Sequence, residues 1–254
     1  MIEQLEKQTI LTIEAIIMIP DKKENKAMIR IVTYNIHSGR DLWWRKRLQQ
    51  MADTLKNLAP DVIGLQEVHQ NSKYGYQASF LADQLGYQLA FSPSIPISDG
   101  QYGNALLTRL PCINTTSLYL PTKKEKRTLL QSTLAWQEKE IAVWVTHCSL
   151  NQASRTAQLN LLTALAQEQS SIPLLLLGDF NAPFVSFASL LVDCATIKGK
   201  ERRPTLPAFR RRLDYIFASS HWRVRSYSLS NAPWSDHVPV IADLELLQSP
   251  AHGE

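Results

Sequence analysis

Ile172-Pro-Leu-Leu-Leu-Leu-Gly-Asp179-Phe-Asn181 is the stretch of the chain that decides the fold. Its four consecutive leucines predict a strand that is buried on both faces. Gly178 ends the run, and Asp179 and Asn181 follow at once. Residues two apart on an extended segment point to the same side, so we expect this acid and this amide to project together from the end of a core strand. The same residues are also turn formers, so the segment taken alone is equally typical of a turn.

The composition is that of one large globular domain with a well-buried core. The chain has 254 residues, of which 44% are hydrophobic and 20% are charged. A net charge of +4 and a pI of about 8.9 are compatible with an anionic substrate. The three cysteines, Cys112, Cys148 and Cys194, have no metal-ligand spacing, which indicates reduced thiols and a cytoplasmic protein.

Residues 1–27 differ from the rest of the chain. Ile10 to Ile19 is apolar, but it is short, Glu14 interrupts it, and no positive cluster precedes it. It therefore predicts neither a signal peptide nor a transmembrane span. We expect residues 1–27 to be a loosely ordered N-terminal extension, residues 28–248 to form the domain, and residues 249–254 to be a flexible tail.

From Ile29 onward, strand patterns dominate and helical patterns separate some of them. Strands are predicted at 29–35, 61–68 (ending at Glu67), 87–91, 102–109, 128–136, 141–147, 174–177, 213–217, 222–230 and 238–246. Helices are predicted at 45–58, 80–85, 152–167 (with Ala157, Leu161, Ala164 and Leu165 on the packed side) and 184–191, and loops at 92–100 and 198–212. This order predicts a layered α/β arrangement.

Polar residues lie where these hydrophobic runs begin or stop. They are Asn35, Glu67, His147, Asp179, Asn181, Asp214, Asp236 and His237. A single one is typical of a cap or turn, but two sheets packed face to face would bring all eight to one rim. The carboxylates suit Mg²⁺, and the histidines can donate a proton to a phosphoryl oxygen near neutral pH. No Walker loop, Rossmann fingerprint, zinc spacing or nucleophile elbow is present in the sequence.

An ordered set of short motifs resembles the endonuclease/exonuclease/phosphatase superfamily, from about Ile29 to Leu246. The motifs are Tyr34-Asn35-Ile-His37, Leu65-Gln66-Glu67-Val68, Gly103-Asn104-Ala-Leu-Leu, Thr146-His147, Gly178-Asp179-Phe-Asn181, Leu213-Asp214-Tyr-Ile and Ser235-Asp236-His237. The resemblance implies a deoxyribonuclease I-like fold, a four-layered α/β sandwich with two mostly antiparallel sheets face to face and helices outside. It also implies Mg²⁺, for which Mn²⁺ can substitute.

The resemblance implies a role for each candidate. Glu67 would be the principal Mg²⁺ ligand, helped by Asn35 and Asp236. Asp179 with Asn181 would position or deprotonate the attacking water. His237, oriented by Asp214, would contact the scissile phosphate, and His147 would stabilise phosphoryl oxygens or assist the leaving group. The candidate substrate-binding residues are His37, Asn104, Arg127, Arg210 and Arg212.

We therefore expect a monomeric, Mg²⁺-dependent phosphodiesterase or phosphatase. Its substrate is a phosphate ester, either a small molecule, a lipid head group or nucleic acid. The alternatives are an endonuclease or exonuclease, and a non-catalytic anion-binding module on the same fold. His37 stands where abasic-site endonucleases carry an acid, which weakens a DNA-repair function. Trp43 and Trp44 can stack on a base, cover a lipid or pack on the helix that follows.

Overall fold

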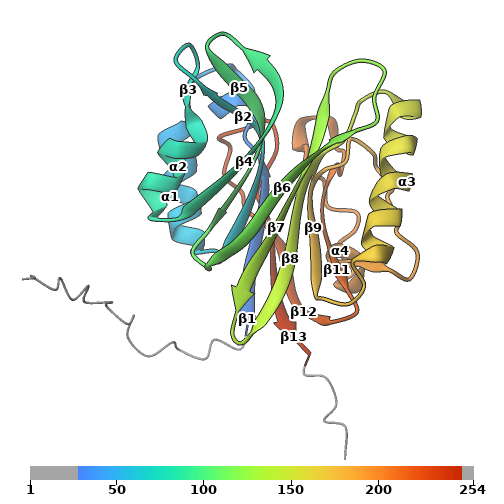
Figure 1. The fold of residues 1–254 in the computed structure, drawn as a ribbon. Coiled ribbons are helices and arrows are strands. Elements are labelled where there is room, and N and C mark those ends of the chain that lie inside the picture. The colour runs from blue at the N-terminus through green and yellow to red at the C-terminus, as the bar shows by residue number, and fades with distance from the viewer. Residues whose placement is uncertain (1–27, 248–254) are drawn as a thin grey trace, which may run out of the picture.

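The computed structural model describes residues 28–247, which form two sheets that pack face to face (Figure 1). The predicted extension (residues 1–27) and tail (residues 249–254) lie outside the described residues. The first sheet contains β1 (Met28–Asn35), β2 (Val62–Asn71), β3 (Gly75–Tyr76), β4 (Gln88–Ile97), β5 (Gly100–Thr108), β12 (Trp222–Leu229) and β13 (Val240–Leu246). The second contains β6 (Cys112–Leu120), β7 (Arg127–Trp136), β8 (Lys139–His147), β9 (Leu174–Asp179), β10 (Leu191–Asp193) and β11 (Asp214–Ser219).

Both sheets are mostly antiparallel. The strand order is β12-β13-β1-β2-β5-β4 in the first sheet, where β3 pairs with β2, and β10-β11-β9-β8-β7-β6 in the second. Only two of the described strand pairs, β1 with β2 and β8 with β9, are parallel. These parallel pairs lie near the middle of each sheet, so the ends of their strands meet at the same rim.

Helices cover the outer faces of the two sheets, and this completes the predicted four-layered sandwich. On the first sheet lie α1 (Leu48–Leu58) and α2 (Gln77–Leu85), and on the second lies α3 (Gln152–Glu168) (Figure 1). The short α4 (Cys194–Ile197) instead packs Cys194 and Ala195 into the core between the two sheets. Two 3₁₀ turns, η1 (His37–Gly39) and η2 (Pro207–Phe209), lie in the connecting segments.

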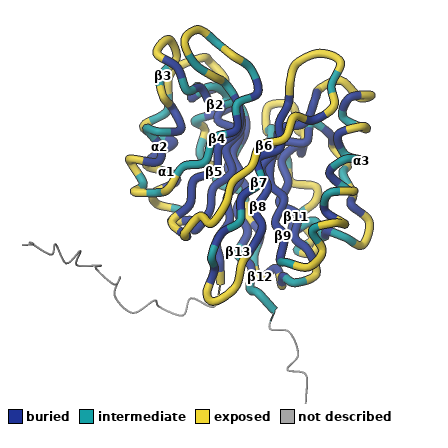
Figure 2. The backbone as a smooth tube through the Cα atoms, viewed as in Figure 1, coloured by how far each residue is buried: buried dark blue, intermediate teal, exposed yellow. Residues whose placement is uncertain are grey.

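Side-chain alternation on β9 explains how the leucine run joins the layers. Leu175 and Leu177 pack in the core between the two sheets, whereas Leu174 and Leu176 pack in the core beneath α3. The strand is therefore buried on both faces, as predicted, and dark blue central strands are visible in Figure 2. Gly178 follows with φ +146°, and a Cβ there would lie 1.9 Å from the carbonyl oxygen of Thr146 on β8. Only glycine fits this approach, which fixes the position of Asp179 beside β8.

Several predicted element bounds were wrong, and most errors lie at sheet edges. The predicted loop at residues 92–100 is mostly strand, because β4 runs to Ile97. As an edge strand it tolerates Pro93 and Pro96, whose missing N–H groups need no partner there. The edge strand β6 was not predicted, because almost all of its residues are exposed and the polar run at 114–117 interrupts its apolar residues, so no apolar alternation is present.

The helical predictions also need correction. No helix forms at residues 184–191, where Phe187 instead packs into the core against Phe180 and Phe217. The helix predicted from Arg45 begins at Leu48, because residues 40–46 form a separate loop. The fully buried residues of α3 are Ser154, Gln158, Leu162 and Ala166. Of the predicted face, Leu161 and Leu165 are partly buried and pack against this core, whereas Ala157 and Ala164 are exposed.

Candidate functional site

The polar residues at the strand ends converge at one rim, as predicted. Asn35 ends β1, His147 ends β8, Asp179 ends β9 and Asp214 begins β11. Asp236 and His237 precede β13, and Glu67 lies within β2. Six elements from both sheets therefore contribute side chains to one place, although these residues are separated by up to about two hundred positions in the sequence.

Glu67 is held by a local distortion of β2, and the strand does not end there as predicted. The pairing of β2 with β5 shifts register between Leu65 and Val68, and Glu67 has φ +61° inside this bulge. A bulky residue in this backbone region is strained, and such strain concentrates at functional sites. The bulge turns the Glu67 side chain into the cavity that the rim residues surround.

Asn35 joins the two sheets at this rim. Its Nδ2 donates to Oε1 of Glu67 and to Oδ2 of Asp179, both at 3.1 Å. Its Oδ1 accepts from the backbone N–H of His37 at 3.0 Å, which fixes the orientation of the amide. An uncharged amide thus holds two carboxylates, one from each sheet, at neighbouring positions.

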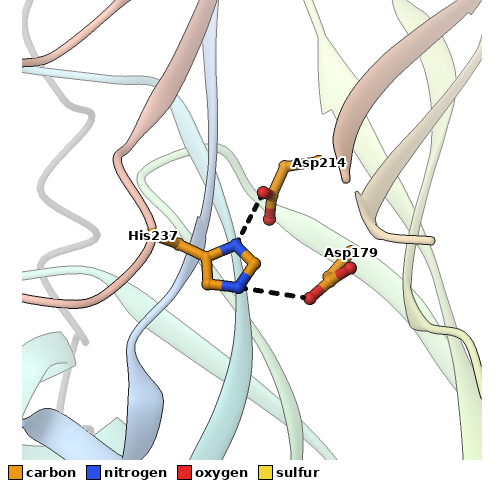
Figure 3. A group of neighbouring side chains, drawn as sticks. All are labelled: Asp179, Asp214 and His237. Atoms are coloured by element: carbon orange, nitrogen blue, oxygen red, sulfur yellow. Dashed lines mark hydrogen bonds and ion pairs between the residues drawn. The ribbon is translucent and has the colours of Figure 1, made fainter. Parts of the chain in front are cut away.

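His237 lies between two carboxylates (Figure 3). Its Nδ1 is 2.7 Å from Oδ2 of Asp214, and its Nε2 is 3.7 Å from Oδ2 of Asp179. Burial by itself would lower the pKa of His237, but the nearby carboxylates, that of Asp214 above all, raise it to about 10. The imidazole is therefore cationic at neutral pH, with both ring nitrogens acting as donors.

Burial acts in the opposite direction on the pKa of Asp179, because Asp179 is an acid. Burial first, and then the neighbouring Asp214 carboxylate, raise the pKa of Asp179 above its usual range. Its Oδ1 accepts from the backbone N–H of Asn181 at 2.8 Å, and Asn181 has φ +50°. The segment is thus a turn, as one of the two interpretations predicted, and it also places Asp179 and Asn181 in the lining of one cavity.

His147 is neutral and has one favoured tautomer. Burial and the neighbouring Arg127 guanidinium hold the pKa of His147 well below its usual range. The Nη1 of Arg127 lies 3.0 Å from Nδ1 of His147, and a guanidinium can only donate, so Nδ1 must accept. The proton then sits on Nε2, which lies 3.6 Å from Oδ2 of Asp179. The Nδ2 of Asn181 also lies 3.0 Å from this nitrogen, but it donates to the Cys148 carbonyl at 2.9 Å. Two N–H donors cannot bond to each other, so Asn181 does not accept the Nε2 proton, which faces the cavity for a ligand oxygen.

A cavity of about 620 Å³ opens above these groups. Its polar lining is Glu67, Arg127, His147, Arg155, Asp179, Asn181, Arg211 and His237, and its apolar lining is Leu150, Pro183, Leu206, Phe209 and Leu213. A volume of this size is typical of a site for a small molecule or for one end of a larger one.

The predicted substrate-binding residues differ in their position relative to the cavity. Arg127 lines the cavity and is paired with His147 and, at 3.3 Å, with Glu125. The Nδ1 of His37 lies 3.7 Å from Oδ1 of Asp236, at the edge of the centre. The side chain of Asn104 is buried and donates to the carbonyl of Thr128, so it ties β5 to β7 and does not line the cavity.

The two predicted arginines of the loop at residues 198–212 do not line the cavity. Arg212 is buried and forms two hydrogen bonds to Asp193 at 2.8 and 2.6 Å, so its charge is used inside the fold. Arg210 is exposed and does not line the cavity, whereas its neighbour Arg211 does. The predicted segment does contribute an arginine to the cavity. Which of its three consecutive arginines faces the cavity depends on the turn at η2, which the sequence does not specify.

Arg155 was not predicted at all. It lies in the first turns of α3 and reaches the cavity, where its Nη1 donates to the carbonyls of Ser149 and Leu150 at 3.0 and 2.9 Å. Its only signal in the sequence is its position shortly after Thr146-His147.

The donor set at Glu67 fits a hard divalent cation. No Lys, Arg or His side chain within residues 28–247 pairs with the Glu67 carboxylate, which leaves a cavity-facing negative charge beside the amide of Asn35. Within the same residues, Asp179, Asp214 and His237 also place ligand atoms within 4.8 Å of one another. That group is less suited to a metal, because both ring nitrogens of His237 already face carboxylates as donors.

A sequence model of the endonuclease/exonuclease/phosphatase family matches residues 32–237, and the chain belongs to this family. Its members are generally hydrolases of phosphate esters that use a divalent metal. The chain is 27% identical to the uncharacterized protein YbhP of Escherichia coli K12, over 89% of this chain and 100% of that protein. The predicted family is therefore confirmed.

Solved structures share the fold. An endonuclease/exonuclease/phosphatase from Beutenbergia cavernae superposes with a TM-score of 0.75 at 22% identity, over 89% of this chain and 73% of that one. The catalytic domain of human nocturnin, solved with a bound sulfate anion, superposes with a TM-score of 0.69 at 25% identity, over 87% of this chain and 95% of that one. None of the helices in residues 28–247 is long and apolar enough to cross a membrane.

Proposed function

We propose that this protein is a Mg²⁺-dependent phosphodiesterase or phosphatase that attacks a phosphate ester with an activated water. The observation that carries the proposal is the buried arrangement of Asp179, His237 and Asp214 at the base of the cavity. A structural core has no need of two like charges buried beside one histidine, and their mutual repulsion is a cost to the fold. Such a cost is typical of a catalytic centre.

Each residue has a role that follows from its protonation state. Asp179, whose basicity is increased by burial, takes the proton of the attacking water, which Asn181 helps to orient. The cationic His237 donates through Nε2 to a phosphoryl oxygen, while Asp214 holds its ring. His147 donates its Nε2 proton to another phosphoryl oxygen or to the leaving group, and Arg127 keeps that proton on Nε2.

Glu67 is the residue that would hold Mg²⁺, with Asp236 as a further oxygen ligand. Asn35, whose Nδ2 donates to Glu67, would keep that carboxylate in place. When bound, the ion supplies Lewis-acid stabilisation of the charge that develops on the phosphate. The human nocturnin catalytic domain was solved with a bound sulfate anion, which supports an anionic ligand for a related protein of this fold.

The test is hydrolysis of bis-p-nitrophenyl phosphate by the purified protein, with Mg²⁺ and with excess chelator. We expect turnover with Mg²⁺ or Mn²⁺ and none in chelator. Turnover that persists in excess chelator would exclude the mechanism. Binding without turnover under every metal condition would favour the anion-binding module.

A nuclease is the second candidate, because two aromatic side chains project into solvent near the site. Trp43 and Trp44 are 73% and 63% exposed, so they do not pack on α1. The Trp44 ring lies 4.9 Å from that of His37. Their loop is held by Asp41, which accepts hydrogen bonds from the backbone N–H groups of Trp43 and Arg45. Exposed, fixed indole rings are suited to stacking on unpaired bases.

A further inference from the structure

We propose that Arg155 and Arg211 form a second anion subsite, which binds a phosphate group that the substrate carries in addition to the phosphate that is cleaved. The inference rests on the proposed function and names its substrate class, a small phosphate ester with a second phosphate. Both arginines line the same cavity as Asp179 and His237. They come from separate segments, one from α3 and one from the loop after η2.

Arg155 is anchored so that part of its guanidinium stays free. Its Nη1 donates to two carbonyls of the loop that precedes α3, and its Nε and Nη2 have no partner within the described residues. A cation in the first turns of a helix is unfavourable beside the positive end of the helix dipole, and α3 has no acid there to offset it. The combined positive charge at this point is suited to an anionic ligand.

Arg211 is positioned by a small hairpin. Its backbone pairs with Leu206 on either side of η2, with hydrogen bonds of 3.3 and 2.9 Å between the two residues. No hydrogen bond or ion pair engages its guanidinium within residues 28–247. The preceding Arg210 has φ +53° and does not line the cavity, so the turn presents one arginine of the pair to the site.

The cavity walls between these groups are apolar. Leu150 and Phe209 are 74% and 63% exposed, although both line the cavity. The carboxylates in the lining, Glu67 and Asp179, belong to the centre already described, so nothing else in the lining neutralises the two arginines. A dianionic phosphate on a compact scaffold fits this combination, because arginine binds phosphate through paired, charge-assisted hydrogen bonds. Nucleosides and inositols are two sources of such a scaffold.

The test compares chromogenic diesters that differ only in the second phosphate. One pair is p-nitrophenyl thymidine 5′-phosphate with and without a 3′-phosphate, and the other is p-nitrophenyl inositol 1-phosphate with and without a 4-phosphate. For the wild-type protein we expect the second phosphate to raise kcat/KM by roughly ten- to a hundred-fold, the scale of charged hydrogen bonds. The pair that shows the larger ratio identifies the scaffold.

Arg211→Ala should bring that ratio close to one and leave kcat/KM for the singly phosphorylated diester nearly unchanged. Arg155→Ala should act in the same direction, with a melting curve to report any loss of order in the loop before α3. Arg210→Ala is the matched control and should keep the wild-type ratio. A wild-type ratio near one for both pairs, or an undiminished ratio in Arg211→Ala, would overturn the subsite.

Failure of the proposed function would be visible separately, as absence of turnover on every diester. In that case, calorimetric binding of thymidine 3′,5′-bisphosphate and inositol 1,4-bisphosphate to the wild-type protein and to Arg211→Ala decides the question. Binding that weakens at least ten-fold in Arg211→Ala would support the subsite without turnover. Equal affinity of both proteins, or no binding to either, would reject it.

Discussion

Individual residues at the proposed catalytic centre carry a cost in stability. Asp179 and Asp214 are both buried, and both carboxylates face the same imidazole of His237. Removing the Asp179 charge therefore relieves repulsion, while it removes the base.

The first prediction concerns the opposite effects of this charge on turnover and on stability. Asp179→Asn should lower turnover by roughly 10²- to 10⁴-fold, the scale of general acid–base contributions, and its melting temperature should not fall. His237→Ala should lower turnover to a similar extent, although it leaves Asp214 without its partner and so should also melt earlier. Steady-state kinetics and thermal melts measure both effects. Near-wild-type turnover in Asp179→Asn would remove the assignment of the base.

The second prediction concerns the metal. Glu67→Gln should weaken Mg²⁺ dependence more than Asn35→Ala, because it removes a charge from a hard-ligand site. The effect is measured as the Mg²⁺ concentration for half-maximal activity and, independently, as the rise in melting temperature on adding Mg²⁺. Glu138→Gln, an exposed carboxylate between β7 and β8, is the control. An unchanged Mg²⁺-induced rise in Glu67→Gln would exclude Glu67 as the principal ligand.

The sequence predicted where the polar residues at strand ends lie, but it did not predict where the arginines lie. Asp179, Asp214 and His147 could be predicted because a polar residue at the end of an apolar run has few purely structural reasons to be there. Arg212 and Arg155 could not be assigned, because a guanidinium reaches several ångströms from its backbone. Only the fold shows that Arg212 pairs with Asp193 while Arg155 faces the cavity.

At the scale of elements, α3 shows where periodicity misleads. Its buried face includes Ser154 and Gln158, because Gln158 accepts from the N–H of Ser149 and donates to the carbonyl of Pro121. These bonds tie α3 to the loops that follow β6 and β8, and they leave apolar Ala157 and Ala164 facing solvent. A polar residue that is buried to hold loops breaks the apolar pattern from which a packed face is predicted.

The third prediction uses this face. Leu162→Ala should lower the free energy of unfolding by about 2–5 kcal/mol, since Leu162 is fully buried in the core beneath α3. Leu161→Ala, one position away and only partly buried, is the matched control and should cost clearly less. Urea denaturation measures both. Equal losses would mean that the sequence-predicted face was the correct one.

The strands also show which elements can be predicted from an apolar pattern and which cannot. Buried strands such as β9 carry continuous apolar runs and could be predicted with near-correct bounds. The edge strand β6 is exposed along its length, so hydrogen bonds to β7 alone make it a strand. The bulge at Glu67 is equally invisible in the sequence, because it depends on pairing with β5, about forty residues away.

At the scale of the whole molecule, the domain boundary yields the fourth prediction. We propose that residues 28–248 form the catalytic domain, since the family match begins at residue 32 and β1 begins at Met28. A protein that starts at Met28 should keep the melting temperature and the turnover of the full chain. Thermal melts and the bis-p-nitrophenyl phosphate assay compare the two. A large drop in melting temperature would show that residues 10–19 pack on the domain.

The fifth prediction concerns the salt dependence of oligonucleotide binding, which distinguishes a small substrate from a polymer. A charge of +4 over 254 residues does not favour a track for an extended nucleic acid. The arginines that reach the cavity serve at most two phosphates, so oligonucleotide binding should release few counterions. For inactive Asp179→Asn, the plot of log affinity against log salt should have a slope of about −2, whereas a track of six or more phosphates would give about −5 or steeper. Titrations with single- and double-stranded oligonucleotides between low and moderate salt measure this slope. Tight binding with the steep slope, lost on replacing Trp43 and Trp44 by alanine, would make a nuclease the better answer.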